Sequence, residues 1–159
     1  MKKMKVLFAV TTILVLIIGS VPGFEIGLSN LSILSQDSDG QYWKALLTAI
    51  PSILIGILIG YFLCRYLLKK WLKTGKSIWT ISLLVLLITF IAGIITVMVA
   101  WEVTWVLSRL LRWKYTEEFS PWANLLDHYL LMLMYGCILV GITSIVNGLF
   151  AFLYLKFSK

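Results

Sequence analysis

The sequence predicts an all-α, polytopic membrane protein built as one bundle of four transmembrane helices. The hydrophobic fraction is 60% and the charged fraction 13%, whereas soluble domains have about 25% charged residues. The mean hydropathy is +0.96. The apolar residues form several runs of about 20, the length at which a helix spans a bilayer. We therefore expect a single membrane domain over residues 1–159, with no separate soluble domain.

The net charge of +7 does not indicate a nucleic-acid-binding protein. The basic residues flank apolar runs, as membrane topology signals do, and no basic stripe with interleaved aromatics is formed. Cys64 and Cys137 lie inside apolar runs and lack the C-x-x-C spacing of a zinc cluster. We expect no metal, no cofactor and no nucleic-acid partner.

The first helix is predicted over residues 5–21, after three lysines near the N-terminus. A basic segment followed by a short apolar run is also typical of a cleaved signal peptide. Because no A-x-A cleavage site follows the run, we favour the uncleaved helix. Residues 22–41 are predicted to form the first outer loop.

The second helix is predicted over residues 42–68, and small residues recur along it at every fourth position. These residues are Thr48, Ser52, Gly56, Gly60 and Cys64. Small residues let helix backbones approach closely in a membrane. We expect this face to contact another helix of the same chain, with self-dimerisation as the alternative. The inner loop over 69–76 is basic, which predicts attraction to anionic lipid.

The third helix is predicted over residues 78–113, or about 54 Å at 1.5 Å per residue, well beyond a hydrocarbon core of about 30 Å. A second face of small or hydroxylated residues along it is the expected mate of the second helix. After a turn at 114–121, the fourth helix is predicted over 122–157, with a small-residue face and an amide, Asn147, inside its apolar run. The residues expected to pack helices together are Ser52, Gly56, Gly60, Gly93, Gly136, Gly141, Ser144 and Gly148.

The distribution of charge predicts the orientation. With the N-terminus inside, the inner face carries ten Lys and Arg residues and the outer face four, and all seven acidic residues lie outside. Basic residues are retained on the cytoplasmic side. We therefore expect a multi-pass protein of the plasma (cytoplasmic) membrane with both termini cytoplasmic.

Residues 101–129 concentrate the polar side chains at the outer ends of the third and fourth helices. We expect this outer hairpin to be a recognition surface formed by Trp101, Trp105, Arg109, Arg112 and Trp122. Glu102, Asp127 and His128 are candidates for acid–base catalysis. Interfacial charges commonly pair to stabilise a helical hairpin, and no catalytic or metal-binding motif is present. Catalysis is therefore the less favoured interpretation.

Three classes of function remain open. The favoured one is a non-enzymatic subunit or accessory protein of a membrane complex, which binds a membrane-protein partner, or further copies of itself, through helix packing and the outer hairpin. The second is a small oligomeric transporter or channel, although no charged residue lies at mid-membrane, where transport pathways usually place one. The third is an interfacial membrane enzyme that uses Glu102, Asp127 and His128.

Overall fold

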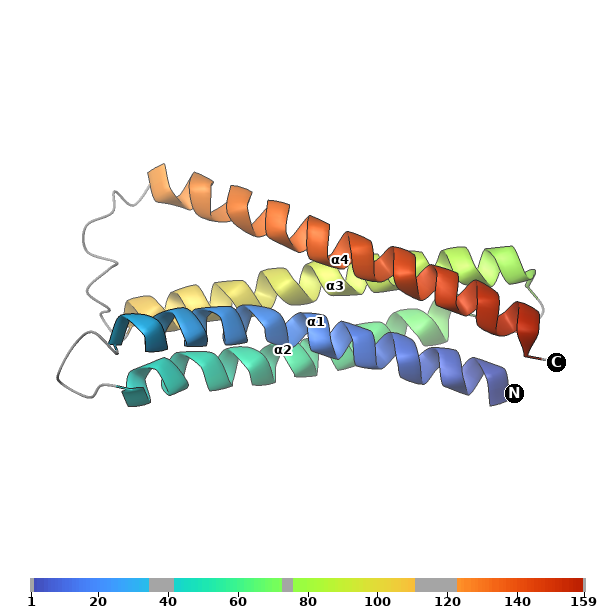
Figure 1. Cartoon of the computed structure of the whole chain (residues 1–159), viewed down its shortest axis with the longest axis horizontal. Coiled ribbons are helices and arrows are strands. Elements are labelled where there is room, and N and C mark those ends of the chain that lie inside the picture. The colour runs from blue at the N-terminus through green and yellow to red at the C-terminus, as the bar shows by residue number, and fades with distance from the viewer. Residues whose placement is uncertain (1, 35–41, 73–75, 111–122, 159) are drawn as a thin grey trace.

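Four long α-helices make up nearly all of the chain that the structure, a computed structural model, describes. It describes residues 2–34, 42–72, 76–110 and 123–158. The helices are α1 (Lys2–Leu34), α2 (Tyr42–Trp71), α3 (Ile78–Leu110) and α4 (Ala123–Phe157). They run lengthwise in alternating directions, so both termini, the end of α2 and the start of α3 lie at one end (Figure 1).

Each helix contains a segment that is long and apolar enough to cross a membrane: Lys3–Phe24, Ala49–Trp71, Ile78–Thr104 and Gly136–Phe157. At 1.5 Å per residue, the shortest of these measure about 33 Å, close to the thickness of a hydrocarbon core. The prediction of an all-helical chain with four such helices is confirmed.

The first helix is longer than predicted. It does not end at residue 21 but continues through Pro22 to Leu34, so 22–34 is helical rather than part of an outer loop. A proline inside a helix removes one backbone hydrogen bond and costs about 3 kcal/mol. Packing against α2 offsets this cost, because Pro22 and Gly23 are buried and a Cβ on Gly23 would lie 3.0 Å from the carbonyl oxygen of Ala49. The rest of the predicted loop, 35–41, lies outside the described residues.

The other helices begin close to their predicted first residues. The second ends at Trp71 rather than at 68, and the fourth begins at Ala123. Ser77 caps α3, because its Oγ accepts a hydrogen bond from the backbone N–H of Thr80 at 3.2 Å. The predicted end of the third helix at 113 and the turn at 114–121 lie outside the described residues.

The main core lies between α1, α2 and α3, where it is built from aliphatic side chains such as Leu7, Leu68 and Ile88. Ala151 joins α4 to this core, and a smaller cluster contains Ile18, Val97 and Val140. The outside of the bundle is also apolar: Phe62 is 65% exposed and Ile138 61%. An apolar exterior around a packed interior is what lipid requires of a bundle in a bilayer.

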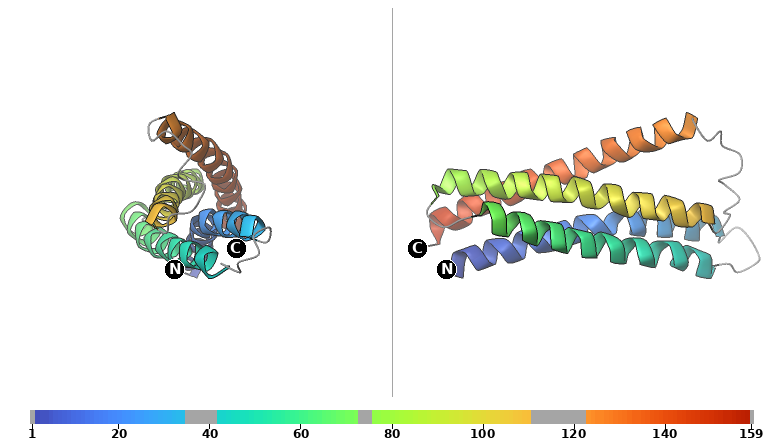
Figure 2. Two further views of the ribbon diagram at one scale, coloured as in Figure 1. Left: turned by 90° about the vertical axis from the view of Figure 1, so that its left-hand side faces the viewer. Right: turned by 180° about the vertical axis from the view of Figure 1, so that it is seen from behind.

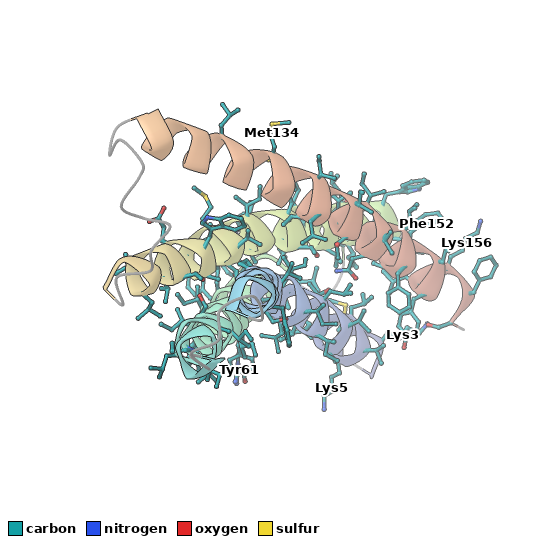
Figure 3. All side chains as sticks on the ribbon, turned by 60° about the vertical axis from the view of Figure 1, so that its left-hand side comes forward. Lys3, Lys5, Tyr61, Met134, Phe152 and Lys156 are labelled. Atoms are coloured by element: carbon teal, nitrogen blue, oxygen red, sulfur yellow. The ribbon has the colours of Figure 1, made fainter. Side chains whose placement is uncertain are left out.

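Helix α4 is inclined to the other three helices and diverges from them toward its first residue, Ala123 (Figures 1 and 2). We call the end that holds both termini the basic end. Lys3, Lys5 and Lys156 lie there (Figure 3), as do the last turns of α2 with Arg65 and Lys69.

Candidate functional site

The predicted outer hairpin is only partly covered by the described residues. Trp101 and Glu102 lie on α3 and are half-buried. The backbones of Trp105 and Arg109 belong to α3, and those of Asp127 and His128 to the first turns of α4, but their side chains lie outside the description. Arg112 and Trp122 lie outside the described residues altogether. The grouping of Glu102 with Asp127 and His128 therefore stays a prediction.

Metal-binding groups are also absent from the part of the chain that is described. No group of three or more His, Cys, Asp or Glu residues there could hold a metal ion. What the structure does bring together is a set of small and hydroxylated residues where the helices meet.

The closest approach joins α1 and α2 at Gly19 and Gly56. A Cβ on Gly19 would lie 2.9 Å from the carbonyl oxygen of Gly56, so a larger residue does not fit without a backbone shift. One turn along α2, a Cβ on Gly60 would lie 3.2 Å from Val15 on α1 and 3.2 Å from Thr96 on α3. Gly56 and Gly60 thus face two helices of their own chain. The predicted mate was the small-residue face of the third helix, and the contact with α1 was not predicted.

Ser52 continues the contact between α2 and α3 on the side of Gly56 that lies away from the basic end. Its hydroxyl donates to the carbonyl oxygen of Ala100 at 2.8 Å and also bonds the hydroxyl of Thr104. The Thr104 oxygen lies 2.7 Å from the same carbonyl oxygen, so the two hydroxyl hydrogens are shared among three contacts. All three residues are fully buried. Glycine contacts and interhelical hydrogen bonds together hold α2 to α3, as expected where lipid offers no hydrophobic gain.

Asn147 bonds α4 to two other helices. Its Nδ2 donates to Thr11 Oγ1 on α1 at 3.0 Å and to Thr89 Oγ1 on α3 at 2.7 Å. The Thr89 hydroxyl donates to the carbonyl oxygen of Val85 at 2.8 Å, which leaves its lone pairs to the amide. All three polar side chains are fully buried. The sequence placed this amide inside an apolar run but did not identify its partners.

The small-residue face of α4 lies against α3. A Cβ on Gly93 would lie within 3.3 Å of Val140 Cγ2, and one on Gly148 would lie 3.0 Å from Leu86 Cβ. Gly136 is less closely packed, with Val97 Cγ1 at 3.5 Å from such a Cβ. Ser144 is buried beside this contact and donates to the carbonyl oxygen of Val140 at 2.6 Å.

Gly141 differs from the other predicted packing residues. Among the described residues, no atom beyond its own helix backbone and chain neighbours lies within 4 Å of a Cβ built on it, so the space beside it is open there. The side chains around it on the outer face of α4 are apolar and exposed, among them Ile138, Ile142 and Ile145. The structure therefore separates Gly141 from the residues that pack this chain against itself.

Sequence reasoning missed Gly19, Gly23, Thr11 and Thr104 among the residues of these contacts. The spacing of the two glycines is itself a small-x-x-x-small pattern, the signal that identified Gly56 and Gly60. The predicted helix end at residue 21 falls between these two glycines, so the pattern does not lie within the predicted helix.

Aromatic side chains accompany the cations at the basic end. Arg65 Nη1 donates to the Tyr61 hydroxyl at 2.7 Å, and Lys70 Nζ donates to the Tyr66 hydroxyl at 3.3 Å. Lys156 Nζ lies 5.6 Å from the ring centroid of Phe157, within the range of a cation–π interaction. The Lys3 ammonium bonds the backbone carbonyl of Ser158, which ties the two ends of the chain together.

Comparisons with protein-family models, curated proteins and solved structures found no match to this chain.

Proposed function

We propose that this protein is a non-enzymatic subunit or accessory protein of a membrane complex, and that it binds its membrane-protein partner through the outer face of α4. The single observation that carries the proposal is the unequal packing of the four helices. Helices α1, α2 and α3 lie side by side, whereas α4 is inclined to them and diverges toward Ala123 (Figure 1). Helix α4 bonds α1 and α3 through Asn147 and packs against α3 at Gly93 and Gly148.

Gly141 marks the surface that we assign to the partner. A glycine lets the backbone of a neighbouring helix approach closely, and no other helix among the described residues comes within 4 Å of the Gly141 Cβ position. Exposed Met134, Ile138 and Ile145 surround it with apolar surface. A transmembrane helix of a partner would bury these side chains against its own.

The described interior supports a packing role over a chemical one. The buried polar side chains there are hydroxyls and one amide, and the hydroxyls of Thr89, Thr96 and Ser144 donate to carbonyl oxygens of their own helices. Ion and substrate pathways through membranes usually contain ionisable groups at mid-depth. Serine and threonine residues whose hydroxyls bond their own helix allow neighbouring helices to pack closely and do not form such a pathway.

The proposed location is the plasma (cytoplasmic) membrane, with both termini on the cytoplasmic side. The described cations gather at the basic end, and basic residues are retained on the cytoplasmic side. The proposed recognition surface at the outer ends of α3 and α4 then faces away from the cytoplasm.

Co-purification in mild detergent tests the proposal. A tagged chain is expected to retain one heteromeric membrane partner, identified by mass spectrometry. Gly141→Leu should abolish this retention, because a branched side chain fills the open space without a clash inside the chain. Ala9→Leu is the matched control, since Ala9 is exposed on α1, away from the proposed surface.

Two results would contradict the proposal. One is a wild-type chain that purifies as a strict monomer without partners. The other is retention of the same partner by Gly141→Leu. Solute flux through liposomes that contain only this chain would instead favour the transporter or channel.

A further inference from the structure

We propose that the last three turns of α2 bind the phosphate of an anionic phospholipid between Arg65, Lys69 and the hydroxyl of Tyr61. The proposal needs the membrane location given above but not the accessory role. It replaces a general attraction of the basic 69–76 loop by a defined site that begins inside the helix.

Arg65 is held in a definite position. Its Nη1 donates to the Tyr61 hydroxyl at 2.7 Å, and its Cζ lies 5.8 Å from the centroid of the Tyr61 ring. Side chains of a helix lean toward its N-terminus, so Arg65 lies over the preceding turn, toward the middle of the span rather than the aqueous end. A guanidinium has five N–H donors, and one bond to a phenol leaves others for an oxyanion.

Tyr61 and Lys69 complete the set of donors. The Tyr61 oxygen accepts the bond from Arg65, which leaves its own hydroxyl hydrogen to be donated to a ligand. Lys69 follows Arg65 by four residues, so both cations share one helix face, and both are exposed. A phosphate beside this face can accept hydrogen bonds from a guanidinium, an ammonium and a phenol. Charge-assisted bonds of this kind are about twice as strong as neutral ones.

This part of the chain supplies no carboxylate to neutralise Arg65 and Lys69. The sequence has no acidic residue between Asp39 and Glu102. Glu102 lies near the other end of the bundle, because α3 runs away from the basic end (Figure 1). The cations of α2 are therefore charges without a carboxylate neighbour on their own helix or on the adjoining first turns of α3.

Depth and neighbours favour a lipid over a free phosphate ion. Arg65 lies about 9 Å before the end of α2 at 1.5 Å per residue, near the boundary between headgroups and hydrocarbon. Leu58 and Phe62 precede it by seven and three residues on the same face and are 54% and 65% exposed. An acyl chain can lie along these two side chains while its phosphate reaches Arg65.

Lys156 is the matched control for this site. It lies at the same end of the bundle and is exposed, but its ammonium lies over the rings of Phe152 and Phe157, at 5.8 and 5.6 Å from the centroids, instead of bonding a phenol (Figure 3). Lys156→Gln and Arg65→Gln both remove one positive charge from this end. If the attraction is diffuse, both variants should lose the same lipid affinity. If Arg65 belongs to a defined site, Arg65→Gln should lose more lipid affinity than Lys156→Gln.

The experiment titrates phosphatidylglycerol, with phosphatidylcholine as the uncharged reference, into the detergent-purified full chain and counts bound lipids by native mass spectrometry. The wild type is expected to bind phosphatidylglycerol more tightly than phosphatidylcholine. A single surface charge contributes a factor of about five, so Lys156→Gln should weaken binding by about fivefold at most. Arg65→Gln should weaken it by about tenfold or more, because hydrogen bonds are lost with the charge.

Two further variants test the geometry. Tyr61→Phe keeps every charge and should weaken phosphatidylglycerol binding, because it removes one donor. Arg65→Lys should rescue only part of the binding, because an ammonium lacks the planar fork of a guanidinium. Size-exclusion profiles that match the wild type show that the variants are folded. Equal losses in Arg65→Gln and Lys156→Gln, or equal wild-type binding of the two lipids, would overturn the site. Neither result depends on a protein partner.

Discussion

Asn147 on α4 and Thr89 on α3 share a hydrogen bond of 2.7 Å between Nδ2 and Oγ1, and both side chains are fully buried. Together with the bond from the same nitrogen to Thr11, this contact makes Asn147 the polar link of α4 to two other helices. These bonds add to the packing of Gly93 against Val140 and of Gly148 against Leu86 in setting the position of the divergent helix.

Asn147→Ala should lower the free energy of unfolding by about 1–2 kcal/mol. Each interhelical hydrogen bond in a membrane contributes about 0.6 kcal/mol, and the shorter side chain also loses packing. Unfolding in mixed micelles with increasing SDS, followed by tryptophan fluorescence, measures the change. Thr143→Val is the control, because the Thr143 hydroxyl bonds only the Leu139 carbonyl of its own helix among the described contacts. A loss as large in the control as in Asn147→Ala would contradict the assignment.

A double-mutant cycle isolates the bond itself. Asn147→Ala and Thr89→Val should show a coupling energy of about 0.6 kcal/mol, since residues that share a bond are not additive. The cycle of Asn147→Ala with Thr143→Val should be additive. Additivity in both cycles would show that the Asn147–Thr89 bond contributes nothing measurable to stability.

Alanine at two glycines should have opposite effects on stability. Gly56→Ala should destabilise the chain by about 1–3 kcal/mol, because its Cβ overlaps the carbonyl oxygen of Gly19 and the interior has no room for it. Gly141→Ala should be neutral or stabilising by up to about 1 kcal/mol, because the new Cβ meets nothing and glycine is a poor helix former. The same SDS titration compares them, and equal effects would contradict the packing described.

The two cysteines should differ in reactivity in the folded chain. Cys64 is fully buried and Cys137 is exposed. In detergent, a small apolar maleimide should modify Cys137 and leave Cys64 unmodified until the chain is unfolded. Intact-mass measurement counts the adducts, and Cys137→Ala provides the variant expected to take up none in the folded state. Two adducts on the folded wild type would place Cys64 at the surface.

Cysteine labelling from the two sides of the membrane tests the orientation. Lys3→Cys and Ser77→Cys, in a chain with both native cysteines replaced by alanine, lie at the same end of the bundle and are exposed. A membrane-impermeant maleimide should modify both only after the cells are opened, because basic residues are retained in the cytoplasm. Modification of both in intact cells would reverse the orientation, and modification of only one would contradict the fold.

The helices themselves were predictable because long apolar runs admit little other than membrane-spanning helices. The error in the first helix has a physical cause. Proline and glycine at 19–23 indicate a helix end when local propensity is considered, but packing of Gly23 against Ala49 overrides it. Such tertiary compensation is not visible in a single segment.

The packing contacts were predictable in part. Spacing identified Gly56, Gly60, Gly93 and Gly148 as small residues on helix faces and predicted that the second helix meets the third, but it did not predict the contact of the second helix with the first. The contact of Gly56 with Gly19, and the choice of Thr11 as a partner for Asn147, depend on the relative height and rotation of whole helices. Those quantities are set by the sum of many contacts, not by one pattern.

The position of Asn147 in the last helix has a consequence for biosynthesis. When α1, α2 and α3 have left the ribosome, Thr89 already donates its hydroxyl hydrogen to the Val85 carbonyl, so it needs no further acceptor in lipid. The two N–H groups of the Asn147 amide enter last, and both bond oxygens that the earlier helices present, Thr11 and Thr89. The order of synthesis thus delivers the costly polar donors only when their acceptors are in place.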